Sequence, residues 1–295
     1  MQSPGTAGPK SGRVQSLIDA QGTIIFPGVY DAVSAKLAEQ AGFELLFISG
    51  YSVSASRLGE PDFGLVTQSE MAEAARSVCR AVGVPVIVDA DTGYGNPLNV
   101  IRTVQDLVEA GAAGMFLEDQ VWPKRCGHMK GKKVVPLDEY VQKIRAAVDA
   151  RAEDDFFIVA RTDANQAVGL DEAIRRVMAA RDAGADAAFI EAPDSLEQLK
   201  TIAKQVPGPL VANMLERGVT PLLNREELRD LGFALAVCPL SGIYAAARAM
   251  KAIYAELRAK GTTREALDKL ITFDEFHDLV GLEEKYALDA KYKSD

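Results

Sequence analysis

Residues 84–119 read VPVIVDADTGYGNPLNVIRTVQDLVEAGAAGMFLED, and the order of apolar and polar residues in this segment indicates its secondary structure. An apolar run at 84–91 ends in carboxylates. It is followed at 98–110 by an amphipathic segment whose apolar residues are spaced three and four apart. The sequence EAGA at 109–112 marks the end of this helical segment, and a second apolar run at 114–119 again ends in carboxylates. The stretch therefore predicts a strand, a helix and a second strand parallel to the first.

The same alternation extends in both directions and gives eight apolar runs in total. Each run is nearly continuous in Val, Ile, Leu, Phe and Ala, as expected for strands that are covered on both faces. Eight successive strand–helix units favour an α/β fold that closes into a single (β/α)8 TIM barrel. The alternative is an open doubly wound sheet, which more often has fewer strands. The predicted strands are 24–28, 45–50, 84–91, 114–119, 156–162, 187–192, 209–213 and 234–239, and the predicted helices include 69–82, 98–110, 137–151 and 170–183.

The two ends of the chain lie outside this repeating pattern. Residues 1–13 are rich in Ser, Gly, Pro and Thr and lack the apolar centre of a secretory signal, so we expect a disordered leader there. The catalytic barrel is then predicted over 14–261, including a final helix at 243–260. Residues 262–295 form an extra C-terminal helical segment that follows the last strand–helix unit and is not paired with a strand. We expect it to pack on a partner subunit or to cap the barrel.

Composition excludes several classes of partner. The chain has 295 residues, of which 48% are hydrophobic and 25% charged, as in soluble globular proteins. A formal net charge of -9 gives no general attraction to nucleic acid or to anionic membranes. No run approaches the roughly 18 apolar residues of a membrane-spanning helix. Three scattered cysteines are too few for a disulfide framework or a zinc cluster, which fits a reducing cytoplasm.

Polar residues follow the predicted strands, at the end of a barrel where catalytic groups gather. Several carboxylates on one rim would repel one another unless a cation neutralised them. Asp89, Asp91 and Glu118 offer oxygen atoms with no neighbouring Cys or His, which favours Mg²⁺, or Mn²⁺, over Zn²⁺. The complete set of residues at the strand ends is Ser49, Gly50, Tyr51, Asp89, Asp91, Glu118, Asp119, Arg161, Thr162, Asp163, Glu191 and Asn213.

The sequence KRCGH at 124–128 follows the fourth predicted strand. Neighbouring cations lower the pKa of a cysteine thiol and suit Cys126 to proton transfer. The chain has only two histidines, His128 and His277, so we expect proton transfer from Cys, Tyr or carboxylate groups rather than from a histidine pair. The other cysteines, Cys79 and Cys238, are interpreted as structural.

Two further features are interpreted as structural. Gly93-Tyr94-Gly95 lacks the Lys-Ser/Thr of a phosphate-binding loop and predicts a tight turn beside the metal ligands. The charges at Arg175, Arg176 and Arg181 are interpreted as a solvated helix surface.

Taken together, these motifs resemble the isocitrate lyase and phosphoenolpyruvate mutase superfamily. The resemblance covers about residues 22–261. It implies a (β/α)8 barrel, a magnesium cofactor and chemistry on the enolates of 2-oxo acids. It also implies homotetramers, as dimers of dimers, in which the last helix is swapped between neighbouring subunits. The motifs are VDADTGYGN (88–96), LEDQVWPKRCGH (117–128), ARTDA (160–164), EAP (191–193) and ANMLERGVTP (212–221).

The resemblance also implies roles for individual residues. Asp89 and Asp91 would bind the metal, with Glu118 assisting. Cys126 would be the general acid, Tyr51 is the first candidate for the base, and Arg161 and Glu191 complete the catalytic set. The residues implied in substrate binding are Ser49, Gly50, Tyr51, Gly127, His128, Arg161, Glu191, Asn213 and Leu215.

One departure from the family pattern concerns the substrate. Methylisocitrate lyases resemble this chain but carry Arg in a Pro-Leu-Ser-x-x-Arg pattern after the eighth strand, where this chain has Tyr244. A tyrosine hydroxyl does not replace a full charge against a third carboxylate. The expected reaction is therefore Mg²⁺-dependent cleavage of a substituted malate, such as 2,3-dimethylmalate, to pyruvate and a second carboxylic acid.

Four alternatives stay open. A methylisocitrate lyase remains possible if Arg217 or Arg248 binds the third carboxylate of a tricarboxylate. The KRCGH region also resembles a phosphonomutase that acts on carboxyphosphonoenolpyruvate. An oxaloacetate decarboxylase or hydrolase is the third alternative, and a non-catalytic scaffold is the fourth.

Overall fold

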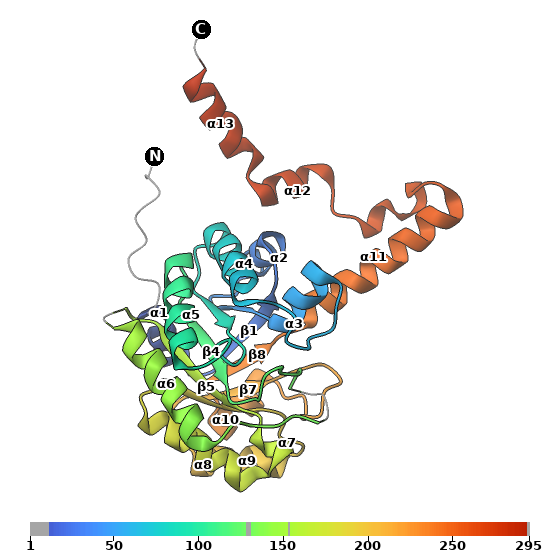
Figure 1. Cartoon of the computed structure of the whole chain (residues 1–295). Helices are drawn as coiled ribbons and strands as arrows, with labels where there is room; N and C mark the ends of the chain where they lie inside the picture. The colour runs from blue at the N-terminus through green and yellow to red at the C-terminus, as the bar shows by residue number, and fades with distance from the viewer. Residues whose placement is uncertain (1–11, 128–130, 153, 294–295) are drawn as a thin grey trace. The chain divides into compact units, whose positions relative to one another are not determined.

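Eight parallel strands form a closed barrel in the order of the chain. The computed structural model describes residues 12–127, 131–152 and 154–293. Ile24 of the first strand pairs with Leu235 of the last, which closes the sheet, so the prediction of a TIM barrel is confirmed and the open sheet is excluded. The strands are β1 (Ile24–Val29), β2 (Leu46–Ile48), β3 (Val86–Asp89), β4 (Gly114–Glu118), β5 (Phe157–Thr162), β6 (Ala187–Ile190), β7 (Leu210–Asn213) and β8 (Leu235–Cys238) (Figure 1).

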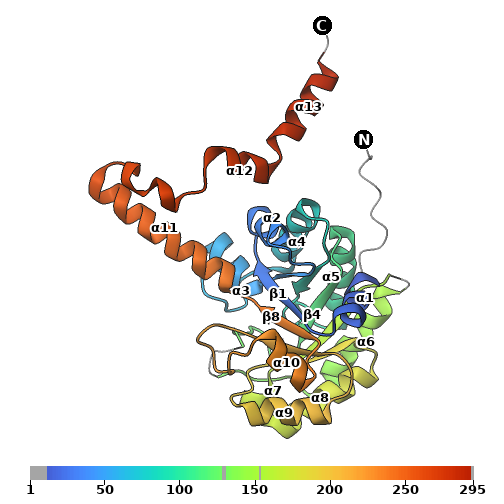
Figure 2. The same ribbon diagram turned by 180° about the vertical axis from the view of Figure 1, so that it is seen from behind.

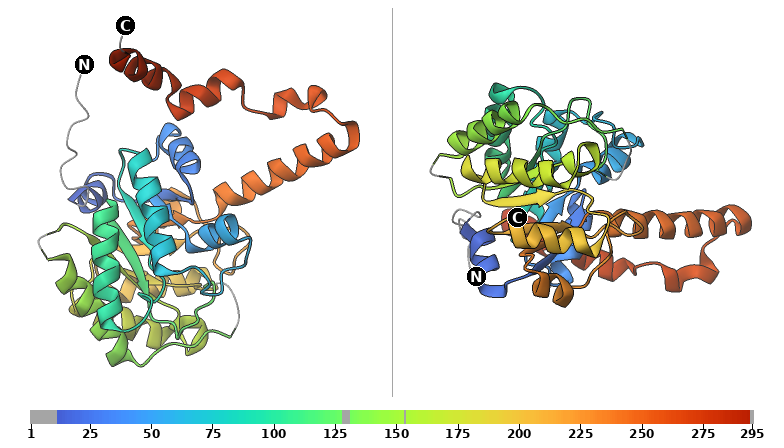
Figure 3. Two further views of the ribbon diagram at one scale, coloured as in Figure 1. Left: turned by 45° about the horizontal axis from the view of Figure 1, so that its top comes forward. Right: turned by 90° about the horizontal axis from the view of Figure 1, so that it is seen from below.

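Helices lie around the outside of the strands (Figures 2 and 3). Their ends follow local sequence signals. The Thr67 hydroxyl accepts from the Glu70 amide at the start of α4, and Gly111 adopts φ 89° at the end of α5. The helices are α1 (Gly12–Gln21), α2 (Ala32–Gln40), α3 (Gly50–Val53), a π-helical turn η1 (Ser54–Leu58), α4 (Gln68–Ala81), α5 (Pro97–Ala110), α6 (Leu137–Arg151), α7 (Ala164–Ala167), α8 (Leu170–Asp182), α9 (Leu196–Gln205) and α10 (Arg225–Leu231).

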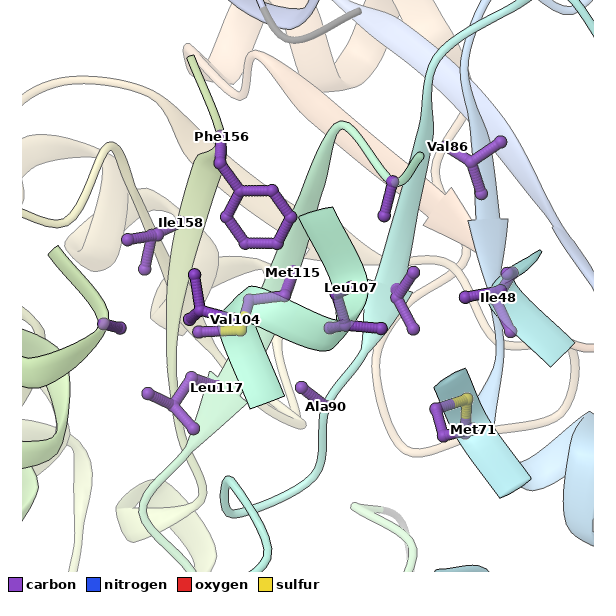
Figure 4. Close-up of a cluster of buried hydrophobic side chains, with 14 of the residues drawn as sticks. Ile48, Met71, Val86, Ala90, Val104, Leu107, Met115, Leu117, Phe156 and Ile158 are labelled. Carbon is purple, nitrogen blue, oxygen red and sulfur yellow. The ribbon is translucent and has the colours of Figure 1, made fainter. Parts of the chain in front are cut away.

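The strands bury both faces, which explains their continuous apolar sequences. One face packs against the helices, as where Val104 and Leu107 of α5 lie beside Met115 and Leu117 of β4 (Figure 4). The other face fills the interior of the barrel with alternate residues from each strand. Large rings dominate this interior, with centroids 4.7 Å apart for Phe47 and Phe116 and 5.5 Å apart for Phe116 and Phe189.

The chain divides into two compact units, one extending to Ser241 and the other comprising Gly242–Asp295. The C-terminal segment is helical, as predicted, and the domain boundary at 261/262 stays a prediction. No side chain of α11 or α13 is buried. None of the helices in the described part of the chain is both long and apolar enough to cross a bilayer. The elements here are α11 (Ser241–Lys260), which begins at the last residue of the first unit, a 3-10 helix η2 (Arg264–Lys269), α12 (Phe273–Val280) and α13 (Leu282–Tyr292).

The interpretation of Arg176 as part of a solvated surface was wrong. Arg176 is 5% exposed because it lies on the inner face of α8 with Ala173 and Ala180. Its Nη1 donates to Asp119 Oδ2 at 3.0 Å and to the Val135 carbonyl at 2.9 Å. Burial raises the pKa of Asp119, and hydrogen bonds and the nearby guanidinium oppose that effect.

The neighbouring predictions had mixed outcomes. Arg175 is exposed, as expected. Arg181 is half-buried and donates to the Ala185 carbonyl at 2.8 Å, so it too was misread as solvated. Gly93, Tyr94 and Gly95 have φ values of 80°, 60° and 150°, and these left-handed conformations are typical of a tight turn.

Replacing Arg176 with Met should destabilise the fold strongly. The change leaves the buried carboxylate of Asp119 without its cation, at a cost of about 3–5 kcal/mol in the free energy of unfolding. The matched change Arg175→Met, on the exposed side of the same helix, should cost about 0.5 kcal/mol or less. Urea unfolding of both variants checks this prediction, and equal effects would contradict it.

Candidate functional site

A pocket of about 450 Å³ opens at the carboxyl ends of the strands, within the first unit. Its residues come from loops that follow several different strands, the arrangement typical of barrel enzymes. The polar or reactive residues that line it are Ser49, Tyr51, Asp62, Asp89, Cys126, Gly127, Arg161, Glu191 and Asn213.

Most residues predicted for the site reach this pocket. Leu215 also lines it. Gly50, Asp91 and Glu118 are buried beside the pocket and are not part of its lining. His128 lies outside the described residues. A side chain at Gly50 would bring a Cβ within 2.9 Å of Asp89 Oδ2, so glycine is required for this close approach.

Arg161, at the end of β5, binds three carboxylates at once. Its Nε lies 3.1 Å from Glu118 Oε2 and 3.0 Å from Asp163 Oδ2, and its Nη2 lies 3.2 Å from Glu191 Oε2. Burial opposes the charge of the guanidinium, but Asp163, Glu118 and Glu191 hold the pKa of Arg161 well above its usual value. Arg161 is therefore a fixed cation in the wall of the pocket.

Glu191 and Asn213 form a second polar group in the wall. Asn213 Nδ2 donates to Glu191 Oε1 at 3.2 Å, and the Ala192 amide donates to the same oxygen at 2.9 Å. Ser49 Oγ accepts from the Ser52 amide at 3.3 Å, at the start of α3. These bonds hold the side chains in place before any ligand binds, as a preorganised site requires.

The carboxylates predicted to bind a metal are incompletely neutralised. Burial raises the pKa of Asp91 to about 7, and Lys124 opposes this shift. Burial also raises the pKa of Glu118 well above its usual value, with Arg161 acting against it. Within residues 12–127, 131–152 and 154–293, Glu118 Oε2 has the ion pair with Arg161, but neither oxygen of this carboxylate accepts a hydrogen bond. Buried oxygens of this kind favour a bound cation.

The same described ranges contain no cluster of three Asp, Glu, His or Cys side chains arranged to hold a metal ion. Mg²⁺ does not require such a cluster, because it keeps several waters and is commonly bound through one or two carboxylates. The oxygen-only donors Asp89, Asp91 and Glu118 therefore fit Mg²⁺, or Mn²⁺, with part of the coordination shell supplied by water.

Two residues that matter to the site were missed from the sequence. Lys124 is buried, and its Nζ lies 2.5 Å from Asp62 Oδ1 and 2.7 Å from Asp91 Oδ1. From the sequence, Lys124 was interpreted only as a cation beside Cys126, whereas it pairs with Asp62 and with Asp91, one of the carboxylates predicted to bind the metal. The sequence feature that could have indicated a role for Asp62 is its place in GEPDFG (59–64), in the long loop after the second strand.

Backbone and side-chain bonds hold the segment that carries Cys126. The Cys126 amide donates to the Asp62 carbonyl at 3.2 Å. The buried Gln120 binds the backbone of Arg125 twice, donating to its carbonyl at 2.8 Å and accepting from its amide at 3.0 Å. Cys126 is half-buried and, of the three cysteines, it alone lines the pocket. Burial, with Glu216, raises the pKa of Cys238 to about 11, so that thiol stays protonated.

The rest of the pocket is apolar. Leu215, Val237, Pro239 and Leu240 form one wall, which we call the aliphatic wall. The rings of Phe47, Phe116 and Phe189 close the pocket toward the barrel interior. These rings were not predicted to line the pocket, because a phenylalanine within a strand cannot be told from an ordinary core residue by sequence. Of the described residues that line the pocket, only Arg161 is cationic.

Comparisons with known proteins identify the family of this chain. The family model for phosphoenolpyruvate phosphomutase matches residues 14–258. A carboxyvinyl-carboxyphosphonate phosphorylmutase from Arabidopsis thaliana is 52% identical over 286 residues, covering 96% of this chain and 84% of the relative. A 2,3-dimethylmalate lyase from Eubacterium barkeri is 45% identical over 280 residues, covering 95% of this chain and 97% of the relative.

Solved structures extend the likeness to the whole fold. The structure of oxaloacetate acetylhydrolase in complex with the inhibitor 3,3-difluorooxalacetate superposes with a TM-score of 0.92 and 37% identity, covering 97% of this chain and 99% of that one. The family match, the close relatives and the shared barrel lead to one conclusion: this chain belongs to the phosphoenolpyruvate mutase/isocitrate lyase superfamily.

Proposed function

We propose that the protein is a Mg²⁺-dependent carbon–carbon lyase that cleaves a substituted malate, such as 2,3-dimethylmalate, to pyruvate and a second carboxylic acid. One observation carries this proposal: a thiol, a single lining cation and an aliphatic wall meet in one pocket beside oxygen-only carboxylates. A single cation suits a dicarboxylate better than a tricarboxylate. The aliphatic wall suits alkyl substituents.

Asp89 and Asp91 would hold the metal, with Glu118 acting through water. When bound, Mg²⁺ supplies Lewis-acid polarisation of the oxygen at C2. Arg161 would bind a substrate carboxylate, and Asn213 and Ser49 would donate hydrogen bonds to it. Leu215 and its neighbours in the aliphatic wall would contact the substituent at C3, and these contacts orient the C2–C3 bond.

The chemistry then follows from two side chains on the pocket wall. Tyr51, as its phenolate, takes the proton of the C2 hydroxyl and becomes the neutral phenol, and the C2–C3 bond breaks as the C2 carbonyl forms. The electron pair of that bond passes to C3 and gives the enolate of the second acid. The thiol of Cys126 donates its proton to C3, while Arg161 and the backbone near Gly127 stabilise the negative charge. Proton exchange with solvent restores both side chains.

A phosphonomutase is the second candidate. The relative named a phosphorylmutase shares 52% identity with this chain. Such an enzyme would rearrange a carbon–phosphorus compound without releasing pyruvate from an alkylmalate, so the products separate the two functions.

We further propose that the enzyme is a cytoplasmic homotetramer. Large apolar side chains in the second unit support an assembly, because side chains such as Phe273 and Tyr292 are 76% and 75% exposed.

Release of 2-oxo acid from a small panel of substrates tests the proposed function. With Mg²⁺ present, we expect pyruvate from 2-methylmalate or 2,3-dimethylmalate, and we expect a chelator to abolish it and added Mg²⁺ to restore it. A coupled reductase assay measures the product. The panel also contains malate, methylisocitrate, isocitrate and oxaloacetate. Cleavage of methylisocitrate alone would contradict a dicarboxylate substrate. If no compound released a 2-oxo acid, the lyase would be contradicted and the phosphonomutase or an oxaloacetate hydrolase would be favoured.

Replacing Cys126 with Ala should lower kcat by about 10² or more, because no thiol then protonates C3. The KM for the alkylmalate should change little. Cys79→Ala, a change in the core of α4, provides the matched control and should leave kcat near that of the wild type. Steady-state kinetics of both variants check the prediction, and near wild-type turnover in Cys126→Ala would remove the thiol from the mechanism.

Shortening Leu215 to Ala should weaken the preference for alkylated substrates. A lost methylene contact in an apolar pocket changes kcat/KM by roughly 10–200-fold. We therefore expect the ratio of kcat/KM for 2,3-dimethylmalate to that for malate to fall by about tenfold. An unchanged ratio would show that the aliphatic wall does not contact the substituent.

A further inference from the structure

We propose that Lys132 is a positioning residue that binds the Gly127 carbonyl and so holds the segment that carries Cys126 against Arg161. The inference rests on the proposed function, in which Cys126 is the proton donor. The side chain of Lys132 is 1% exposed. Its ammonium donates to the Gly127 carbonyl and, at 2.7 Å, to Asp163 Oδ1. A buried ammonium with these two acceptors ties the loop to the end of β5.

Gly127 is packed directly on the groups that bind substrate. A Cβ at this position would lie 2.5 Å from Arg161 Nη2 and 2.5 Å from Glu191 Oε2, so no side chain fits. Gly127 has little space in which to shift, and the hydrogen bond from Lys132 fixes the direction of its carbonyl. Because Gly127 directly follows Cys126, the position of Gly127 limits where the sulfur of Cys126 lies in the pocket.

Asp163 connects the loop that carries Cys126 to Arg161, the cation that is proposed to bind substrate. Its Oδ1 accepts from Lys132, and its Oδ2 accepts from Arg161 Nε at 3.0 Å. The Asp163 amide donates to Asp119 Oδ1 at 2.9 Å, which anchors the carboxylate to the rim of the barrel. The buried carboxylate of Asp163 therefore fixes the loop that carries Cys126 and the guanidinium of Arg161 relative to each other.

Lys132 is separable from the metal ligands, unlike Lys124. Lys124 pairs with Asp91, so its replacement would change metal binding as well as the loop. Removal of the Lys132 ammonium still leaves Asp163 paired with Arg161, so the change does not strand a lone buried carboxylate. Its main effect is to release the Gly127 carbonyl.

The test compares Lys132→Met with Lys133→Met. Lys133 is an exposed neighbour whose carbonyl accepts from the Val121 amide, a bond that the control substitution retains. The rate of Cys126 alkylation by iodoacetamide is measured in the full-length protein with Mg²⁺ and without substrate, and peptide mass spectrometry locates the modified thiol. We expect Lys132→Met to raise this rate by about threefold or more, because the released loop exposes the thiol. Lys133→Met should match the wild type.

Kinetics provide the second measurement. Misplacing the donor by about 1 Å should lower kcat by roughly tenfold to 10² while KM changes by less than about threefold. Lys132→Arg keeps a cation beside Asp163 and should give a rate of alkylation between that of wild type and that of Lys132→Met. If Lys132→Met does not fold, Lys132→Arg is compared with Lys133→Met instead, and a rate above that of the control supports the inference.

Equal alkylation rates in the Lys132 and Lys133 variants would overturn the positioning role. Alkylation does not depend on turnover, so this outcome is distinct from failure of the proposed lyase. If no compound in the substrate panel is cleaved, the lyase proposal fails, and the alkylation comparison still decides whether Lys132 holds the loop.

Discussion

Charge compensation at the carboxyl end of the barrel is the constraint on which the site depends. A buried carboxylate is costly unless a cation or several hydrogen-bond donors accompany it. Here the cations come from the loop after β4, from β5 and from the outer helix α8, so that neutralising the rim also connects these elements. The buried carboxylates are Asp62, Asp89, Asp91, Glu118, Asp119, Asp163 and Glu191, and the buried cations beside them are Lys124, Lys132, Arg161 and Arg176.

Much of the fold was predictable because each strand is buried on both faces and helices of the barrel such as α4 and α5 carry an apolar stripe. These patterns are local, so the sequence placed every strand to within a few residues, and the strand ends in turn indicated Arg161, Glu191 and Asn213. Contacts that depend on the path of a loop were not predictable in this way. Asp62 meets Lys124 across two loops, and the burial of Arg176 depends on a carboxylate distant in sequence.

The division of the pocket into polar and apolar parts bears on how related enzymes differ. The comparisons join this chain to proteins named for a mutase, a lyase and a hydrolase, all built on one barrel. A fold shared by several reactions does not determine which one occurs, so function has to be argued from the side chains of the site. In the function proposed for this chain, the polar groups would activate an acid, and the aliphatic wall would contact its substituents.

The three phenylalanine rings beneath the pocket have a further consequence. Phe47, Phe116 and Phe189 fill the barrel interior, so a ligand has no route through the barrel. In a cleavage that yields two products, both must leave by the opening through which the substrate entered. In the proposed lyase, substrate entry and the release of both products would therefore share one path.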